Sequence, residues 1–173
     1  MPVVSGSSGR DVAASLAPLL GMQHIELVSR RFPDGEGYVR VPTDAIDAVR
    51  AEPVVLVSNT YPDSGVVQTV LLLEALTDVR KGELSNLKEE EPQSLDDVGP
   101  GIYLAIPYFG YSRQDKRFSK GEALSARVIA EILARGCDGI AILDLHEPAV
   151  LEGMDVPMQF VSSMPEIAER LQT

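Results

Sequence analysis

Three basic residues fall within five positions of one short segment, Arg113-Gln114-Asp115-Lys116-Arg117. The segment follows an apolar run that ends at Pro107 and is typical of a buried strand. Arg offers paired planar donors and Lys a compact charge, so this combination suits a polyphosphate, and Gln114 could read a neutral polar group. An exposed charged loop that pairs with acidic neighbours is an equally good interpretation of the same residues.

A histidine flanked by carboxylates ends a second apolar run, in Asp144-Leu145-His146-Glu147. Such a histidine can ligate a metal, act as an acid or base, or be an ordinary polar loop residue. The closely spaced ligands of a zinc site are missing, so structural zinc is not expected. Mg²⁺ carried in with phosphates and touched by one or two protein groups fits better. The other histidine, His24, begins an early strand, where a structural role is expected.

Small residues fill the segment Ser5-Gly6-Ser7-Ser8-Gly9, between a predicted strand and a predicted helix. Small residues can expose backbone N–H groups at a helix N-terminus, where phosphates bind. The segment matches neither G-x-x-x-x-G-K-[ST] nor G-x-G-x-x-G, so a tight turn with helix capping is the preferred interpretation. A single cysteine, Cys137, cannot form an internal disulfide and indicates a structural thiol in a reducing compartment.

Short apolar runs alternate with longer amphipathic stretches along the chain, which predicts an α/β fold with a mainly parallel sheet flanked by helices. Ligands bind beyond the C-terminal ends of the strands in such sheets, where the two charged segments lie. Residues 32–40 look like a small excursion from the sheet, in which Asp34, Glu36 and nearby arginines could form a salt-bridged hairpin. Strands are predicted at 2–4, 24–28, 54–57, 102–106 and 140–143, and helices at 9–20, 64–80, 122–135 and 165–171.

The chain has 173 residues, 45% of them hydrophobic, and a formal net charge of −11. This length suits one domain or half of a larger protein. No membrane span or signal peptide is predicted, so a cytoplasmic location is expected. The acidic total argues against nonspecific binding to nucleic acid or anionic membranes. Residues 113–127 are the exception, with a net charge of +3. Residues 81–101 are expected to form an acidic surface insert, with an acidic interaction site as the alternative.

Four segments taken together closely resemble ribose-phosphate pyrophosphokinase, and the pairing of Phe118 with Gly121-Glu122 is similar to the archaeal branch of that family. These segments are RFPDGEGYVR at 31–40, PYFGYSRQDKRF at 107–118, GEALSAR at 121–127 and DLH at 144–146. The resemblance implies a phosphoribosyltransferase-like fold, with residues 1–173 as the N-terminal domain. It also implies transfer of the diphosphoryl group of ATP to the 1-hydroxyl of ribose 5-phosphate, with Mg²⁺ as the cofactor.

The same resemblance assigns roles to six residues. Arg113 and Gln114 would contact ATP, and His146 would hold Mg²⁺. Phe32, Asp34 and Glu36 would receive the adenine of ATP bound to a neighbouring subunit, which implies a homo-oligomer. No residue is assigned a catalytic role.

Segments typical of the second half of the chain in members of this family are missing from these 173 residues. They include the acidic loop that binds ribose 5-phosphate, a flexible loop with catalytic basic residues and a second metal-binding Asp. The chain is therefore expected to be an incomplete, inactive half of the enzyme. The alternative is a noncatalytic synthetase-associated protein that serves regulation or assembly.

Overall fold

A six-stranded parallel sheet forms the centre of the computed structural model, which describes residues 1–82, 84 and 101–172. The strand order is β2-β1-β5-β6-β7-β8, and every neighbouring pair is parallel. The predicted α/β class is therefore confirmed. The strands are β1 (Val3–Ser5), β2 (His24–Glu26), β5 (Val54–Val57), β6 (Ile102–Ile106), β7 (Gly139–Leu143) and β8 (Met158–Val161).

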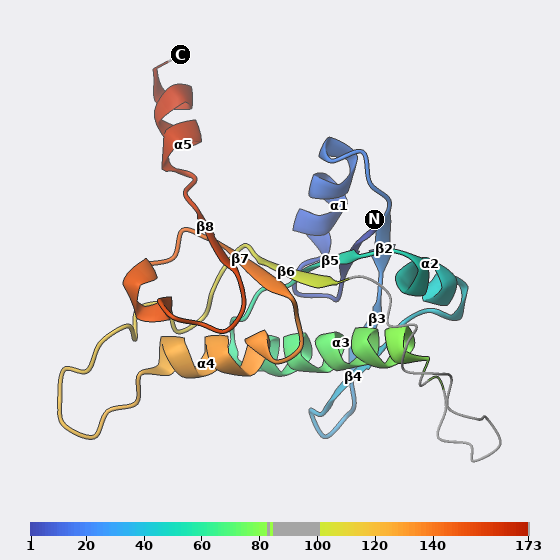
Figure 1. The fold of residues 1–173 in the computed structure, drawn as a ribbon, viewed down its shortest axis with the longest axis horizontal. Helices are drawn as coiled ribbons and strands as arrows, with labels where there is room; N and C mark the ends of the chain where they lie inside the picture. The colour runs from blue at the N-terminus through green and yellow to red at the C-terminus, as the bar shows by residue number, and fades with distance from the viewer. Residues whose placement is uncertain (83, 85–100, 173) are drawn as a thin grey trace.

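Helices cover both faces of this sheet (Figure 1). On one face, α3 and α4 contribute Leu72, Leu76 and Leu133 to the main apolar cluster. On the other face, Ala13 and Ala17 of α1 pack against Val3 and Val57. The burial of apolar residues on alternating sides of the strands explains why β5, β6 and β7 read as nearly continuous apolar runs. The helices are α1 (Arg10–Leu19), α2 (Ile46–Ala51), α3 (Asp63–Lys81), α4 (Ser125–Ala134) and α5 (Met164–Leu171), with 3-10 turns η1 (Thr43–Ala45) and η3 (Pro148–Leu151).

The excursion predicted at 32–40 is an antiparallel hairpin of β3 (Val28–Arg31) and β4 (Gly37–Arg40). It packs along α3 and projects beyond that helix (Figure 1). The strand predicted at 24–28 is confirmed as β2, but it is shorter than predicted because the chain leaves the sheet after Glu26. The N–H of Leu27 still donates to the carbonyl of Ser5, at 2.8 Å, before β3 diverges into the hairpin.

One further boundary differs from the prediction, and two elements are additional to it. The helix expected from Glu122 begins at Ser125, because the Glu122 carboxylate instead accepts hydrogen bonds from the backbone N–H groups of Phe118 and Ser119. Strand β8 and helix α2 were not predicted. Strand β8 is an edge strand with alternating exposure. Helix α2 has only six residues, which are too few to show a helical period of apolar residues.

Helix α3 ends at Lys81, where Gly82 adopts φ of 79° and the C-cap conformation that favours glycine. The acidic insert predicted at 81–101 lies outside the described residues, apart from 81, 82, 84 and 101. None of the described helices is long and apolar enough to cross a membrane.

Candidate functional site

The loop from residue 107 to residue 124 carries the basic segment and is anchored at its start to the loop after β5. The N–H of Gly110 donates to Thr60 Oγ1 at 2.7 Å, and the N–H of Tyr108 donates to Asn59 Oδ1 at 2.9 Å. A Cβ atom at Gly110 would lie 2.2 Å from the Thr60 carbonyl oxygen, so only glycine permits this approach. The loop therefore starts from a fixed position at the C-terminal edge of the sheet.

Tyr111 ties the same loop to the start of α3. Its hydroxyl donates to Asp63 Oδ1 at 2.6 Å, and this hydrogen bond raises the pKa of Tyr111 above its ordinary value. The residue adopts φ of 66°, a left-handed conformation that side chains rarely take. The bond to Asp63 keeps Tyr111 in this conformation, and the resulting turn of the backbone leads to Arg113.

The outer part of the loop closes on itself around Glu122. Its carboxylate accepts from the N–H groups of Phe118 and Ser119, at 2.6 and 3.0 Å, and these bonds lower the pKa of Glu122. Arg117 Nε donates to the Glu122 carbonyl at 2.8 Å, and Lys116 Nζ lies 5.2 Å from the ring centre of Phe118. Two of the basic side chains thus stabilise the loop itself.

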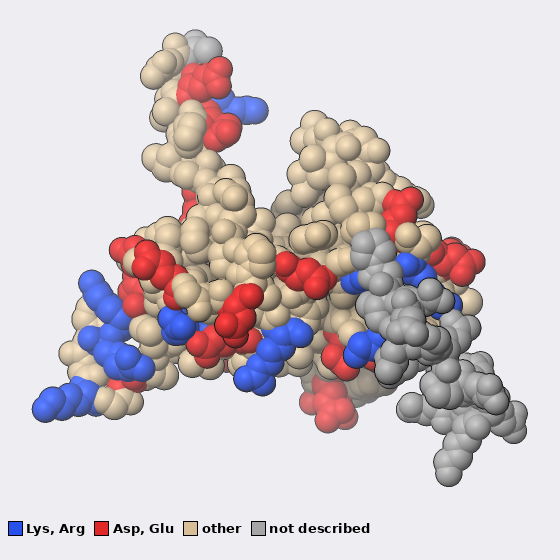
Figure 2. Space-filling model, viewed as in Figure 1, with Lys and Arg blue, Asp and Glu red and all other residues tan. Residues whose placement is uncertain are grey.

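Arg113 is different, because its exposed guanidinium has no hydrogen bond or ion pair among the described residues. Figure 2 shows Lys and Arg side chains gathered at the end of the molecule where this loop projects. The neutral neighbour of Arg113 is fixed more firmly. Gln114 Oε1 accepts from Ser125 Oγ at 2.6 Å, and the Gln114 N–H donates to the Tyr111 carbonyl at 2.8 Å. The amide NH₂ of Gln114 has no partner among the described residues and is left to meet a ligand.

His146 lies beside this loop because β6 and β7 are neighbours in the sheet. Its Nδ1 is hydrogen-bonded to Asp115 Oδ2 at 2.8 Å, and this bond lowers the pKa of the Asp115 carboxyl. The structure thus brings Arg113, Gln114 and His146 to one edge of the sheet. Sequence reasoning did not identify the partners that hold them, Asp115 and Ser125, because no local pattern links residues 31 positions apart.

Asp144 adopts φ of 49° at the end of β7, and its carboxylate is engaged with the start of the last helix. It accepts from the N–H of Ser163, at 2.9 Å, and from the Ser163 hydroxyl. These bonds hold the pKa of Asp144 below its ordinary value. Asp144 therefore joins β7 to α5 and does not offer a free carboxylate beside His146.

The donor set suits a cation that arrives with its own ligands. The described residues contain no cluster of three His, Cys, Asp or Glu that could hold a metal ion. His146 is half-exposed, and Nε2 has no partner in the described part of the chain. One free imidazole nitrogen fits Mg²⁺ whose other ligands are phosphate oxygens and water.

The hairpin carries the other three predicted residues and does not lie with the 107–124 loop (Figure 1). The ring of Phe32 is 40% exposed and meets the ring of Tyr38 edge-on at 5.8 Å. Asp34 Oδ1 accepts from the N–H of Glu36 at 3.1 Å, which shapes the turn. No ion pair joins Asp34 or Glu36 to an arginine in the described structure, so the hairpin forms but is not salt-bridged.

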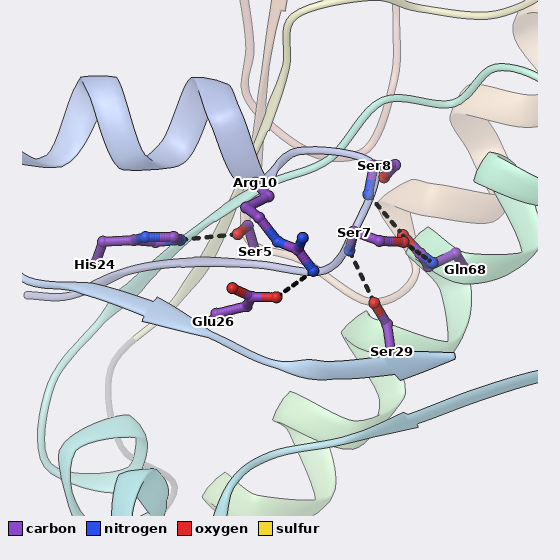
Figure 3. Close-up of polar contacts among 8 residues, drawn as sticks. All are labelled: Ser5, Ser7, Ser8, Arg10, His24, Glu26, Ser29 and Gln68. Carbon is purple, nitrogen blue, oxygen red and sulfur yellow. Dashed lines mark hydrogen bonds and ion pairs between the residues drawn. The ribbon is translucent and has the colours of Figure 1, made fainter. Parts of the chain in front are cut away.

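The N–H groups of the serine-rich loop at 5–9 donate hydrogen bonds to side chains elsewhere in the protein (Figure 3). The N–H of Ser7 donates to Ser29 Oγ at 2.8 Å, and the N–H of Ser8 donates to Gln68 Oε1 at 3.1 Å. The expected tight turn is confirmed, but the expected side-chain cap of α1 is wrong, since none is formed. Close packing replaces it, because a Cβ at Gly9 would lie 2.0 Å from the Val57 carbonyl oxygen.

The surroundings of His24 and Cys137 agree with the structural roles predicted for these two residues. His24 Nε2 is hydrogen-bonded to the buried Ser5 hydroxyl at 2.9 Å (Figure 3). Cys137 is partly buried against the main core, and burial raises the pKa of its thiol to about 11. A thiol with so high a pKa is a poor nucleophile, in agreement with a structural role.

Comparisons with known proteins agree with the arrangement of these elements. Residues 100–136 match the sequence model of the N-terminal domain of ribose phosphate pyrophosphokinase. The ribose-phosphate pyrophosphokinase of Methanothermobacter thermautotrophicus is 37% identical over 172 residues, which are 98% of this chain and 52% of that protein. The enzyme of the same name from Halobacterium salinarum is 33% identical over 169 residues, again 98% of this chain and 52% of the relative.

The fold is also that of a solved structure. The crystal structure of phosphoribosylpyrophosphate synthetase from Mycobacterium smegmatis superimposes with a TM-score of 0.75 and 21% identity, covering 98% of this chain and 51% of that one. The chain thus spans about half the length of the curated relatives it matches. Nearly all of the chain is thus similar to about half of each ribose-phosphate pyrophosphokinase, and its residues 100–136 match the N-terminal domain of that family.

Proposed function

We propose that this chain supplies the ATP-binding half of a ribose-phosphate pyrophosphokinase. Together with a second half that binds ribose 5-phosphate, it would form phosphoribosyl diphosphate and AMP. The observation that carries this proposal is the convergence of Arg113, Gln114 and His146 at the C-terminal ends of β6 and β7. Unpaired cationic and amide donors next to a free imidazole nitrogen match a nucleotide polyphosphate and its cation.

In the proposed reaction, the 1-hydroxyl oxygen of ribose 5-phosphate forms a bond to the β-phosphorus of ATP. The bond from that phosphorus to the α,β-bridging oxygen breaks, AMP leaves with this oxygen, and the hydroxyl proton is lost. Such transfers depend mainly on alignment and on stabilisation of the phosphoryl charge. The guanidinium of Arg113 would bind the phosphates, and the amide NH₂ of Gln114 would orient the nucleotide.

His146 would hold Mg²⁺ through Nε2, and this ion would neutralise phosphate charge when bound. Asp144 is not assigned as a ligand of the ion, because its carboxylate already accepts hydrogen bonds from Ser163. The imidazole contributes one ligand at the edge of the phosphate site.

Phe32, Asp34 and Glu36 would complete the adenine site of a neighbouring subunit in a homo-oligomer. The hairpin supports this assignment because it lies apart from the 107–124 loop of its own chain (Figure 1). Its aromatic ring is partly exposed for stacking, and Glu36 is exposed and able to accept from an amino group.

Calorimetry of the 173-residue chain with ATP and Mg²⁺ tests this proposal, with ribose 5-phosphate as the matched control ligand. We expect saturable binding of ATP, no binding of ribose 5-phosphate, and no phosphoribosyl diphosphate from the two together. Absence of ATP binding at millimolar concentration contradicts the proposed function. Formation of phosphoribosyl diphosphate by these residues alone contradicts the expectation that a second half is needed.

A further inference from the structure

The hydrogen bond between His146 and Asp115 joins two loops that leave neighbouring strands. The Nδ1–Oδ2 distance is 2.8 Å. The Asp115 side chain is only 7% exposed, whereas the His146 side chain is 59% exposed. The carboxylate is therefore enclosed by the protein, and the imidazole extends from it toward solvent.

The chemistry of the two groups fixes the position of the imidazole proton. An ionised carboxylate has no hydrogen to donate, so the proton of this bond must lie on Nδ1. A neutral imidazole protonated on Nδ1 carries its lone pair on Nε2, the nitrogen with no partner among the described residues. Without Asp115, the ring would lose both its orientation and this choice of tautomer.

Asp115 also connects the imidazole to the nucleotide-facing residues. It directly follows Gln114, whose side chain is held by Ser125 and whose N–H is held by the Tyr111 carbonyl. The carboxylate is thus carried next to a residue that is itself held by hydrogen bonds. The bond from Asp115 to His146 adds to the pairing of β6 with β7 in placing the His146 ring near the Gln114 amide.

We propose that Asp115 is a positioning residue that fixes the Nδ1–H tautomer of His146 and presents Nε2 to a divalent cation bound to the ligand's phosphates. The role of the cation rests on the proposed function. The tautomer rests only on the contact itself, so the two can be tested separately.

Nitrogen-15 NMR of the histidine rings tests the tautomer in the full chain. The sequence contains only two histidines, so His24 serves as an internal reference. The spectra are recorded at about pH 8.5, two units above the ordinary histidine pKa. We expect His146 to be protonated on Nδ1, whereas Asp115→Ala should shift it toward the Nε2–H form that free imidazole prefers. The control Asp44→Ala, which removes an exposed carboxylate elsewhere, should leave the His146 spectrum unchanged. A wild-type His146 protonated on Nε2 overturns the proposal, even if the Asp115→Ala chain does not fold.

Binding of Mn²⁺, followed by electron paramagnetic resonance in the presence of a nonhydrolysable ATP analogue, tests the role of the cation. Loss of such an orienting partner typically weakens metal binding about 10- to 100-fold. We expect this loss for Asp115→Ala and none for Asp44→Ala. A switch of tautomer with unchanged Mn²⁺ affinity overturns the proposed positioning role. Failure of the wild-type chain to bind the nucleotide instead overturns the proposed function, and the tautomer spectrum still decides the pairing of Asp115 with His146.

Discussion

The serine-rich loop at 5–9 and the basic loop at 107–124 both follow parallel strands and both precede helices, yet they use their donors in opposite ways. In the first loop, the N–H groups of Ser7 and Ser8 are bound by Ser29 and Gln68 (Figure 3). In the second loop, Arg113 and the NH₂ of Gln114 have no partner among the residues that the structure describes. A place at the C-terminal edge of the sheet therefore does not by itself leave hydrogen-bond donors free for a ligand.

The internal bonds of the basic loop explain how its free donors stay in place. Glu122 accepts two backbone N–H groups, Tyr111 is bound to Asp63, and Ser125 holds Gln114. The serine-rich loop instead packs its backbone against β5, so its role is to position α1.

The largest expected effect comes from Gly9→Ala, which tests whether the serine-rich loop is structural. The new Cβ would lie 2.0 Å from the Val57 carbonyl oxygen, so the backbone of α1 or β5 must move. We expect a loss of about 3 kcal/mol in the free energy of unfolding, the upper end of the usual cost of overpacking, measured with urea. Gly37→Ala is the matched control, because its Cβ would meet only Leu71 Cδ1 at 3.4 Å. Equal stability of the two variants contradicts the close approach at Gly9.

Arg113→Ala tests the basic loop, where the donors have no partner among the described residues. We expect ATP affinity to fall by about 1.5 to 3 kcal/mol, the usual contribution of hydrogen bonds to charged groups, with folding unchanged. Arg135→Ala removes an exposed cation just past the C-terminal end of α4 and should leave ATP affinity unchanged. Calorimetry on the folded variants measures both. If Ser7→Ala lowered ATP affinity as much as Arg113→Ala, the contrast between the two loops would be wrong.

The sequence predicted the sheet and the positions of the free donors because both follow from local patterns. Apolar runs marked β5, β6 and β7, and the cluster of cations after β6 marked the loop that carries Arg113. The roles assigned to Arg113, Gln114 and His146 as ligand contacts remain predictions, although the structure brings them to one edge.

The supporting contacts could not be predicted, because they join residues far apart in the chain. The bond from Tyr111 to Asp63 spans 48 positions, and the bond from His146 to Asp115 spans 31. Such pairs are brought together by the order of the strands in the sheet, and no local sequence pattern predicts that order. The start of α4 was misplaced for a different, local reason, since the Glu122 carboxylate accepts hydrogen bonds from the preceding turn instead of beginning the helix.

Ser125→Ala measures how much the fixed orientation of Gln114 contributes. Removal of the hydroxyl frees Gln114 Oε1, so the amide can rotate and no longer presents only its NH₂. We expect ATP affinity to fall by about 0.5 to 1.5 kcal/mol, the net contribution of one ordinary hydrogen bond. Ser15→Ala is the control, because its hydroxyl donates only to a carbonyl within α1. Calorimetry should place the loss below that of Arg113→Ala; a larger loss contradicts the assignment of the main phosphate contact to Arg113.

The smallest effect is expected from acid titration of Glu122, which tests whether the basic loop holds its shape through this carboxylate. Backbone N–H groups of Ser119 and Phe118 lower the pKa of Glu122 in the folded chain below the ordinary 4.5. Its contribution to stability is therefore fully present above pH 4.5 and is lost as the pH falls through the lowered folded-state pKa. Urea midpoints of the wild type and Glu122→Gln should differ by a constant amount near neutral pH and converge in this acid range, while Glu74→Gln on α3 controls for the loss of one exposed carboxylate. A difference that does not change with pH would assign the effect of Glu122→Gln to packing alone, and the loop would then depend on its anchors at Thr60 and Asp63.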